Sequence, residues 1–349
     1  MKKYFFLLLC ASWSYIVNAQ NLPRVIVLST GGTIAGKQPN TDKAGYLPGK
    51  ISVDELLKNI PSIKQKAIVQ GEQIAAIGSY DMTIEIWIKL AKRINEIFAK
   101  NEADGIVITH GTDTQEETAY FLSLTVQSNK PVVLTGSMRP ATAISTDGPK
   151  NLYDAIIVAS DLTSKGVMLC FNENIFDAKN VVKINTTNVN AFGSPNAGAI
   201  GHVYDGKVTF TTSNVHSSNH FKPFDISNMD SLPKVEIVYA YAGASDAAIN
   251  AFINNNSAGI IIAGTGNGSF DKAILASVKN AVQKNIIVVR STRVFSGAVT
   301  TAYVGAFDDE KLGSIVSDNL NPQKARILLM LALTITKDKK KIQDMFLSY

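Results

Sequence analysis

The stretch Val25–Lys37, VIVLSTGGTIAGK, decides how the fold of this chain of 349 residues is interpreted. A run of apolar and small residues leads into two glycines, Gly31 and Gly32, and then into Thr33. This order is typical of a buried strand that enters a tight turn, where the turn binds a phosphate or presents a nucleophile. The stretch matches neither GxxxxGK[ST] nor GxGxxG, the two common phosphate-binding patterns. We therefore interpret Thr33 as a nucleophile.

A second turn supplies the groups that such a nucleophile needs. In THGTDT, residues 109–114, another hydroxyl, Thr112, is followed by a carboxylate, Asp113, which could bind the amine of a small zwitterionic substrate. A lysine with a lowered pKa could accept a proton from Thr112, although position alone does not identify that lysine. Glycines such as Gly32 let a substrate approach the backbone and leave N–H groups free to hold an oxyanion.

The rest of the chain alternates short apolar runs with longer segments of helical period, which is typical of parallel sheets with crossover helices. We predict a two-domain α/β fold. A larger N-terminal domain with a parallel sheet of the flavodoxin or Rossmann type spans 20–214, a linker spans 215–232, and a smaller α/β domain spans 233–349. Strands are expected at 25–30, 105–109, 131–135, 166–171, 235–244, 259–266 and 285–292, and helices at 85–100, 115–126, 150–160 and 321–336. The last helix is expected to begin with Asn321 as its N-cap and Pro322 in its first turn.

Several polar residues come directly after predicted strands, namely Thr33, Thr112, Asp113 and Ser137. In open parallel sheets, ligands bind at the carboxyl ends of the strands, at the point where the winding direction reverses. We therefore expect these turns to converge on one crevice.

The N-terminus is typical of an exported protein. Lys2 and Lys3 precede an apolar run that ends before Val17-Asn18-Ala19, which predicts a signal peptide over 1–19, cleavage after Ala19, and a periplasmic or secreted protein. The run is shorter than the ~20 residues of a spanning helix, so no membrane association is expected after cleavage. Cleavage also removes Cys10 and leaves Cys170 as the single cysteine, which excludes an intrachain disulfide.

The charge balance excludes a nucleic-acid-binding footprint. Removing Lys2 and Lys3 lowers the formal net charge from +5 to +3, and such a small surplus does not indicate a nucleic-acid partner. The one dense basic run, KDKKK at 337–341, is predicted to be the solvated C-terminal end of a helix, where cations suit the helix dipole.

Six segments together resemble the bacterial type II L-asparaginases and glutaminase-asparaginases. They occur in the family's order and span nearly the whole mature chain. They are TGGTIAGK (30–37), HGTDTQEETAYFL (110–122), GSMRP (136–140), DGPKNLYDA (147–155), KINTTNV (183–189) and LNPQKARILLMLALT (320–334). The resemblance implies an amidohydrolase that releases ammonia from asparagine, and to a lesser extent from glutamine, through an acyl-threonine intermediate. It further implies that no metal or cofactor is needed, and that the protein forms a homotetramer with sites between subunits.

The resemblance also assigns roles to residues, position by position. Thr33 matches the nucleophile, Tyr46 a tyrosine on a mobile lid, and Ser79 a residue that binds the substrate's α-carboxylate. Thr112, Asp113 and Lys183 match a second group of hydroxyl, carboxylate and lysine, and which threonine attacks is left open. The predicted catalytic set is Thr33, Tyr46, Thr112, Asp113 and Lys183, and the predicted substrate-binding set is Gly32, Ser79, Tyr80, Thr112, Asp113 and Ser137.

Three departures from the family pattern concern substrate recognition. Tyr80 stands where Gln or Glu is usual, Gly243 stands where Asn is frequent, and the segment 298–308 lacks an acidic residue at the family's position. Each lost amine partner should cost roughly 1 to 3 kcal/mol of binding. We therefore predict that asparagine is preferred over glutamine, with a raised KM. The alternatives are a broad glutaminase-asparaginase and a non-catalytic amino-acid-binding protein.

The remaining candidates have simpler interpretations. His216 and His220 have a spacing that could bind a metal on a helix, but their segment lacks a helical period, so solvated linker histidines are expected. His110 is expected to be a hydrogen-bonded structural histidine rather than a general base. Lys179 is expected on a charged surface.

Overall fold

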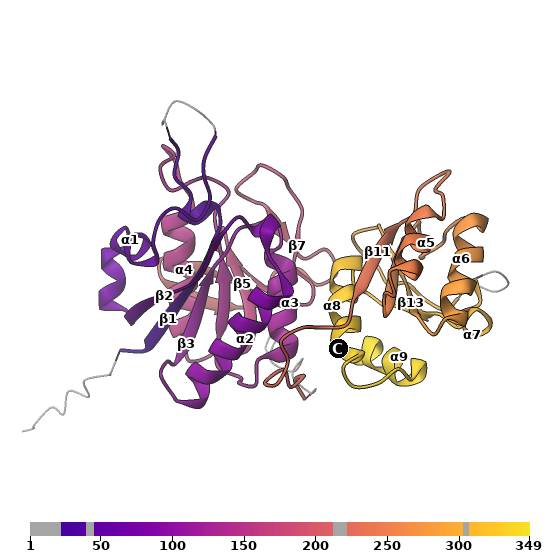
Figure 1. The fold of residues 1–349 in the computed structure, drawn as a ribbon. Helices are drawn as coiled ribbons and strands as arrows, with labels where there is room; N and C mark the ends of the chain where they lie inside the picture. The colour runs from indigo at the N-terminus through magenta and orange to yellow at the C-terminus, as the bar shows by residue number, and fades with distance from the viewer. Residues whose placement is uncertain (1–21, 40–44, 212–221, 303–306) are drawn as a thin grey trace, which may run out of the picture.

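The computed structural model describes residues 22–39, 45–211, 222–302 and 307–349. The predicted signal peptide at 1–19 and both His216 and His220 lie outside these ranges. Figure 1 shows two α/β domains side by side, each built on its own sheet. The predicted fold class is therefore confirmed.

The larger domain contains a mixed sheet, which in the described part of the chain has the strand order β10-β9-β6-β5-β4-β3-β1-β2. Strands β1 to β5 run parallel, whereas β6, β9 and β10 pair antiparallel with their neighbours. The strands are β1 (Arg24–Gly31), β2 (Ile68–Ile77), β3 (Gly105–Thr109), β4 (Val132–Thr135), β5 (Val167–Phe171), β6 (Asn174–Asp177), β9 (Gly201–Tyr204) and β10 (Lys207–Phe210). The short ribbon of β7 (Val182–Lys183) and β8 (Phe192–Gly193) forms a separate antiparallel pair.

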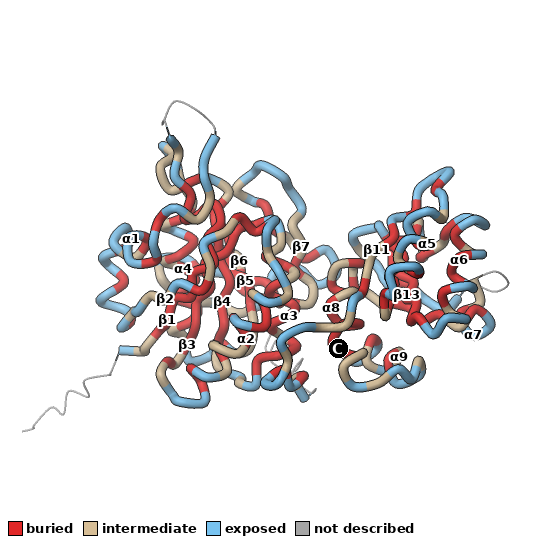
Figure 2. The backbone as a smooth tube through the Cα atoms, viewed as in Figure 1, coloured by how far each residue is buried: buried red, intermediate tan, exposed pale blue. Residues whose placement is uncertain are grey.

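Helices cover both faces of this sheet. On one face α2 (Ile84–Ala99) and α3 (Gln115–Thr125) pack against Leu28 and Ile108, and on the other α1 (Val53–Lys58) and α4 (Gly148–Ser160) pack against Val27 and Val107. The central strands are therefore buried on both sides, as the red segments of Figure 2 show. Burial on both faces is why these strands are continuous apolar runs rather than alternating ones. The described part of this domain also contains three short 3-10 turns: η1 (Thr33–Ala35), η2 (Pro61–Gln65) and η3 (Ser79–Asp81).

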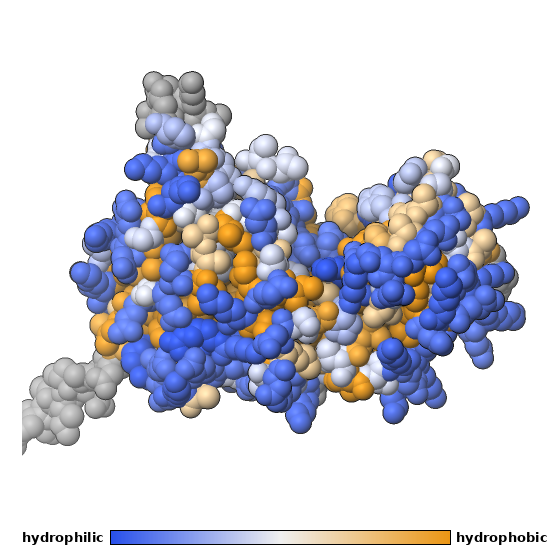
Figure 3. Space-filling view, viewed as in Figure 1, coloured by the Kyte–Doolittle hydropathy of each residue, from blue (hydrophilic) through white to orange (hydrophobic). Residues whose placement is uncertain are grey.

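The smaller domain is a parallel sheet in the order β11-β12-β13-β14. Its strands are β11 (Val235–Tyr239), β12 (Gly259–Gly264), β13 (Ile287–Thr292) and β14 (Ile315–Val316), and its helices are α5 (Ala247–Asn254), α6 (Lys272–Gln283), α7 (Asp309–Leu312), α8 (Pro322–Ala332) and α9 (Lys339–Ser348). Hydrophilic side chains cover much of this domain's face in Figure 3. None of the described helices is both long and apolar enough to cross a membrane.

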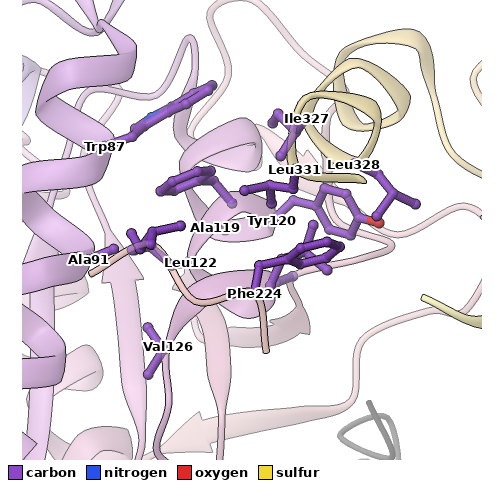
Figure 4. Packing of buried hydrophobic residues seen from close by; sticks show 14 of the residues in the cluster. Trp87, Ala91, Ala119, Tyr120, Leu122, Val126, Phe224, Ile327, Leu328 and Leu331 are labelled. Carbon is purple, nitrogen blue, oxygen red and sulfur yellow. The ribbon is translucent and has the colours of Figure 1, made fainter. Parts of the chain in front are cut away.

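Helix α8 joins the two domains. It lies beside α3 in Figure 1, and its Ile327, Leu328 and Leu331 pack toward Tyr120 of α3 and Phe224 in Figure 4. One hydrophobic core therefore runs from the larger sheet through α3 and α8 into the smaller sheet.

The predicted start of α8 is confirmed, because Asn321 caps it by accepting the N–H of Lys324 at 3.0 Å. The predicted end at residue 336 is wrong. Helix α8 ends at Ala332, and a new helix, α9, begins at Lys339 after Asp338, which caps it. The basic run therefore lies at the N-terminus of a helix, where the Asp338 carboxylate, rather than the dipole, accommodates it.

Candidate active site

The candidate site lies at the carboxyl ends of β1 and β3, the two strands between which the winding direction of the sheet reverses. Gly32, with φ of 78°, begins the turn after β1 and lies against Gly111 in the turn after β3. A Cβ atom on Gly32 would come within 2.3 Å of the Gly111 nitrogen. Only glycine allows this approach, and it brings the turns that carry Thr33 and Thr112 together, as predicted.

Thr33 is the first residue of η1 and is buried. Its Oγ1 lies 2.7 Å from the phenolic oxygen of Tyr46. Tyr46 reaches this place because the segment that carries it is bound to the η1 turn: Lys37 and Leu47 exchange two backbone hydrogen bonds of 3.0 and 2.9 Å. The structure thus brings together two residues that the family resemblance paired. Residues 42–44 of the predicted lid lie outside the described ranges.

The second predicted group also comes together. Nζ of Lys183 donates to Oγ1 of Thr112 at 2.9 Å and to Oδ1 of Asp113 at 2.7 Å. The Lys183 side chain is 17% exposed, whereas that of Asp113 is 56% exposed. A half-buried lysine that contacts a threonine hydroxyl is placed for proton exchange with it, and the open side of Asp113 faces solvent.

Ser79 connects the turns after β2 and β3. It is buried in η3, its Oγ accepts the Asp113 N–H at 3.1 Å, and its carbonyl accepts the Thr114 hydroxyl at 2.7 Å. Its hydroxyl proton remains available for another acceptor. The adjacent Tyr80 is 68% exposed, and its ring folds back against Gly78.

Two predicted substrate contacts have other partners in this structure. The Gly32 N–H donates to the carbonyl of Ile77 at 2.8 Å, so the expectation of a free N–H is wrong at this residue. The hydroxyl of Ser137 is buried and donates to the carbonyl of Arg139 at 2.7 Å. Both residues shape the turns of the site, and their contact with substrate stays a prediction.

His110 is a structural histidine, as expected. It is fully buried, with Nδ1 2.6 Å from the Gly111 carbonyl and Nε2 2.9 Å from Oγ1 of Thr118. Because Nδ1 faces a carbonyl, it carries the proton of the neutral ring, so Nε2 accepts the Thr118 hydroxyl, which in turn accepts the Trp87 indole N–H at 2.7 Å. Burial lowers the pKa of His110 to about 4. The neutral ring therefore braces the turn that carries Thr112.

The structure adds residues that the sequence did not single out. Glu116 is buried, and its carboxylate accepts the backbone N–H of Lys183. Lys324 of α8 is also buried and donates to the carbonyl of Lys179 at 2.9 Å. Their signal in the sequence was weak, because charged residues in amphipathic helices usually face solvent. Lys179, predicted on a charged surface, is half-buried, and burial lowers its pKa.

A cavity of about 500 Å³ opens between the domains beside Asp113 and Lys183. Its opposite wall comes from the smaller domain, including Tyr239, Phe295 and Asn321. This volume suits a small organic ligand. Among the residues that the structure describes, no three His, Cys, Asp or Glu side chains cluster as metal ligands would.

This fold and site define an α/β protein with two threonine hydroxyls, each beside a tyrosine or a lysine, at a topological switch point. Residues 24–216 match the family model of the N-terminal asparaginase domain, and residues 234–346 match that of the glutaminase/asparaginase C-terminal domain. The chain therefore belongs to the asparaginase family and is a hydrolase of linear amides.

Similar proteins cover nearly the whole chain. A probable periplasmic L-asparaginase of Haemophilus influenzae is 47% identical over 95% of this chain and 94% of its own length. A glutaminase-asparaginase of Pseudomonas fluorescens is 40% identical over 94% of this chain and 91% of its own length. A crystal structure of a probable cytoplasmic L-asparaginase from Campylobacter jejuni is 49% identical, with a TM-score of 0.88 over 94% of this chain and 100% of that one.

Proposed function

We propose that this protein hydrolyses the side-chain amide of L-asparagine to L-aspartate and ammonia through an acyl-threonine intermediate. The observation that carries the proposal is that two threonine hydroxyls, each with a proton-exchanging neighbour, lie at one topological switch point. Thr33 lies 2.7 Å from the Tyr46 oxygen, and Thr112 lies 2.9 Å from Nζ of Lys183. The similarity to proteins named L-asparaginase supports it.

In the proposed reaction, the hydroxyl oxygen of one threonine adds to the amide carbon, and its proton passes to the neighbouring group. Ammonia leaves when the tetrahedral intermediate collapses and the amide nitrogen takes up a proton. Water then adds to the threonine ester and releases aspartate and the free hydroxyl. Dividing the reaction into two acyl transfers lowers the barrier of each step. We assign the attack to Thr33, the exchange of its proton to Tyr46, and a second proton exchange to Thr112 and Lys183.

Substrate recognition is assigned to the polar groups around this centre. The exposed oxygen of Asp113 binds the substrate's α-amine, and the hydroxyl of Ser79 donates to its α-carboxylate. Tyr80 and Gly243 are the departures from the family pattern. Gly243 adopts φ of 76° with open space around it, so it offers no side chain to an amine. The missing amine contact raises KM for both amides, and the bulk of Tyr80 leaves less room for the longer glutamine, so asparagine is preferred.

The test is ammonia release by the purified chain from L-asparagine and from L-glutamine. Thr33→Ala and Thr112→Ala should each abolish turnover, and only the variant that keeps the nucleophile should still accumulate an ester when quenched in acid. Equal rates on both amides would favour a broad glutaminase-asparaginase, the activity named for the Pseudomonas relative. Binding of either amino acid without ammonia release, retained in Thr33→Ala, would favour a binding protein.

Export and assembly belong to the same proposal. The Haemophilus relative is named periplasmic, which supports a cleaved leader over 1–19, whereas the Campylobacter structure is named cytoplasmic. Mass spectrometry of the protein from the periplasmic fraction should give an N-terminus at Gln20, and light scattering should give the mass of a homotetramer. A full-length chain in the cytoplasm, or a monomer, would contradict these two parts.

A further inference from the structure

Lys183 lies in an element that has little support of its own. The ribbon of β7 and β8 is two residues long on each side and is separate from the larger sheet. An isolated ribbon of this length is not stable by itself. The position of Nζ beside Thr112 and Asp113 therefore depends on contacts from outside the ribbon.

The first outside contact comes from the smaller domain. Lys324 of α8 is 1% exposed, and its Nζ donates to the carbonyl of Lys179 at 2.9 Å and also to the carbonyl of Val181. Both carbonyls lie in the turn that leads directly into β7. The ammonium also lies 6.0 Å from the ring centroid of Tyr120. Burying an amine is costly unless its donors are satisfied, and here the turn before Lys183 accepts two of the three.

The second outside contact comes from α3. The Glu116 carboxylate accepts the backbone N–H of Lys183 with one oxygen and the side-chain amide of Asn321 with the other, at 3.0 Å. Asn321 is in turn the N-cap of α8. The start of α3, which follows Thr112 and Asp113, therefore binds β7 itself, and the start of α8 binds the turn that precedes it.

We infer that Lys324 and Glu116 are positioning residues for Lys183, so that α8 and α3 of each chain set the position of Lys183 in that same chain. The inference rests on the proposed function, in which Lys183 exchanges a proton with Thr112. Neither residue touches the reacting atoms. A shift of the ribbon would lengthen the contact between Nζ and Thr112 without removing any side chain from the site.

The test compares Lys324→Met with Arg326→Met. Methionine keeps the unbranched apolar stem of the lysine but lacks the ammonium and cannot donate. Arg326 lies on the same helix and donates to the carbonyl of Val235, away from β7, so it controls for a lost contact of α8. We expect Lys324→Met to lower kcat between about 10-fold and 100-fold and to keep KM within about threefold. Arg326→Met should keep kcat within about twofold at a similar loss of thermal stability. A folded Lys324→Met protein with kcat near that of the wild type would overturn the inference.

A second variant and a second measurement cover the other outcomes. Glu116→Gln keeps the shape of the side chain but has one acceptor oxygen instead of two. It therefore tests the positioning of Lys183 by its outside contacts if Lys324→Met does not fold. Hydrogen exchange of peptides that cover residues 179–184 should accelerate in both variants and not in Arg326→Met. This measurement needs no turnover, so it shows whether Lys324 and Glu116 hold β7 in place even if the wild-type chain hydrolyses neither amide. Unchanged exchange in both variants would overturn the inference.

Discussion

Gly32 and Gly111 lie so close together that the backbones of their two turns are in contact, with 3.1 Å between a Cβ placed on Gly111 and the Gly32 Cα. The two turns follow β1 and β3, adjacent parallel strands. This contact sets the spacing between the Thr33 turn and the Thr112 turn. The geometry of the site therefore depends on the absence of two side chains as much as on the presence of others.

Gly32→Ala should be far more damaging than a matched glycine substitution. At Gly198, φ is 76° but no atom lies within 4 Å of the position that an alanine methyl would occupy, so Gly198→Ala should cost only about 1 to 2 kcal/mol for the left-handed backbone. Gly32→Ala adds a collision with Gly111, so it should either lower the free energy of unfolding by more than about 4 kcal/mol or displace the turn that carries Thr33. Urea unfolding and ammonia release measure both effects, and similar losses in the two variants would contradict the role of this contact.

Tyr46→Phe should lower kcat by about 100-fold or more and leave KM nearly unchanged. The phenyl ring still packs against Gly36, but the oxygen 2.7 Å from Thr33 Oγ1 is lost, so the nucleophile loses its proton-exchange partner. Steady-state kinetics with asparagine check this. A change in KM alone would show that Tyr46 only covers the site.

Asp113→Asn should act mainly on KM. The carboxylate binds the Lys183 ammonium at 2.7 Å, and we assign its exposed oxygen to the substrate's amine. Replacing the charge should weaken substrate binding by about 1.5 to 3 kcal/mol, or roughly 10-fold to 100-fold in KM. Calorimetry of L-aspartate binding provides a readout that is free of turnover, and equal affinity for both proteins would remove Asp113 from amine recognition.

In the folded protein, the His110 ring should remain neutral above about pH 5. Its folded pKa of about 4 lies below the unfolded value of 6.5, so the unfolded chain takes up the proton first. The neutral ring therefore makes its full contribution to the free energy of unfolding above pH 6.5. As the pH falls toward 4, the free energy of unfolding decreases by roughly 3 kcal/mol because of this histidine.

Two measurements test this behaviour of His110. The NMR signals of its ring should not shift between about pH 8 and pH 5. In urea unfolding, the free energy of unfolding should decrease more for the wild type than for His110→Gln when the pH is lowered from about 8 to about 4.5. A ring that titrates near neutrality would show that the imidazole reaches solvent.

The ion pair of Arg290 and Asp309 should stabilise the smaller domain strongly. Arg290 is fully buried and donates to both Asp309 oxygens, at 2.7 and 2.6 Å. Asp309→Ala leaves a buried unpaired guanidinium and should cost about 3 to 5 kcal/mol. Lys311→Ala breaks an exposed pair with the neighbouring Asp308 and should cost under about 1 kcal/mol. Comparable losses in thermal unfolding would contradict the difference in burial.

Local signals in the sequence predicted local structure well. The apolar runs at 105–109 and 131–135 became β3 and β4, which are buried along their whole length, and Asn321 followed by Pro322 began α8 as predicted. The strand predicted at 235–244 was too long, since β11 ends at Tyr239. The break between α8 and α9 was missed because residues 333–338 contain neither glycine nor proline, the usual breakers. The antiparallel edge of the larger sheet was also missed, since β6, β9 and β10 are only four residues long each.

The site could be predicted only in part from the residues themselves. Thr33 and Thr112 stood out because each follows a strand and a glycine. Tyr46 and Lys183 did not, and only the family resemblance selected them, because their partners lie 13 and 71 residues away along the chain. No spacing rule connects positions that are separated by whole elements of structure.

The sequence by itself determined the two α/β domains, the glycine turns after β1 and β3, and the start of α8, because hydrophobic periodicity and capping act over a few residues. Only the tertiary structure decided how closely Lys183 approaches Thr112, that the buried His110 ring is held neutral, and that Lys324 and Glu116 hold the ribbon of Lys183. Those relationships arise when α3 and α8 pack into one core, since the burial of distant apolar faces, rather than any local pattern, sets where their charged groups come to lie.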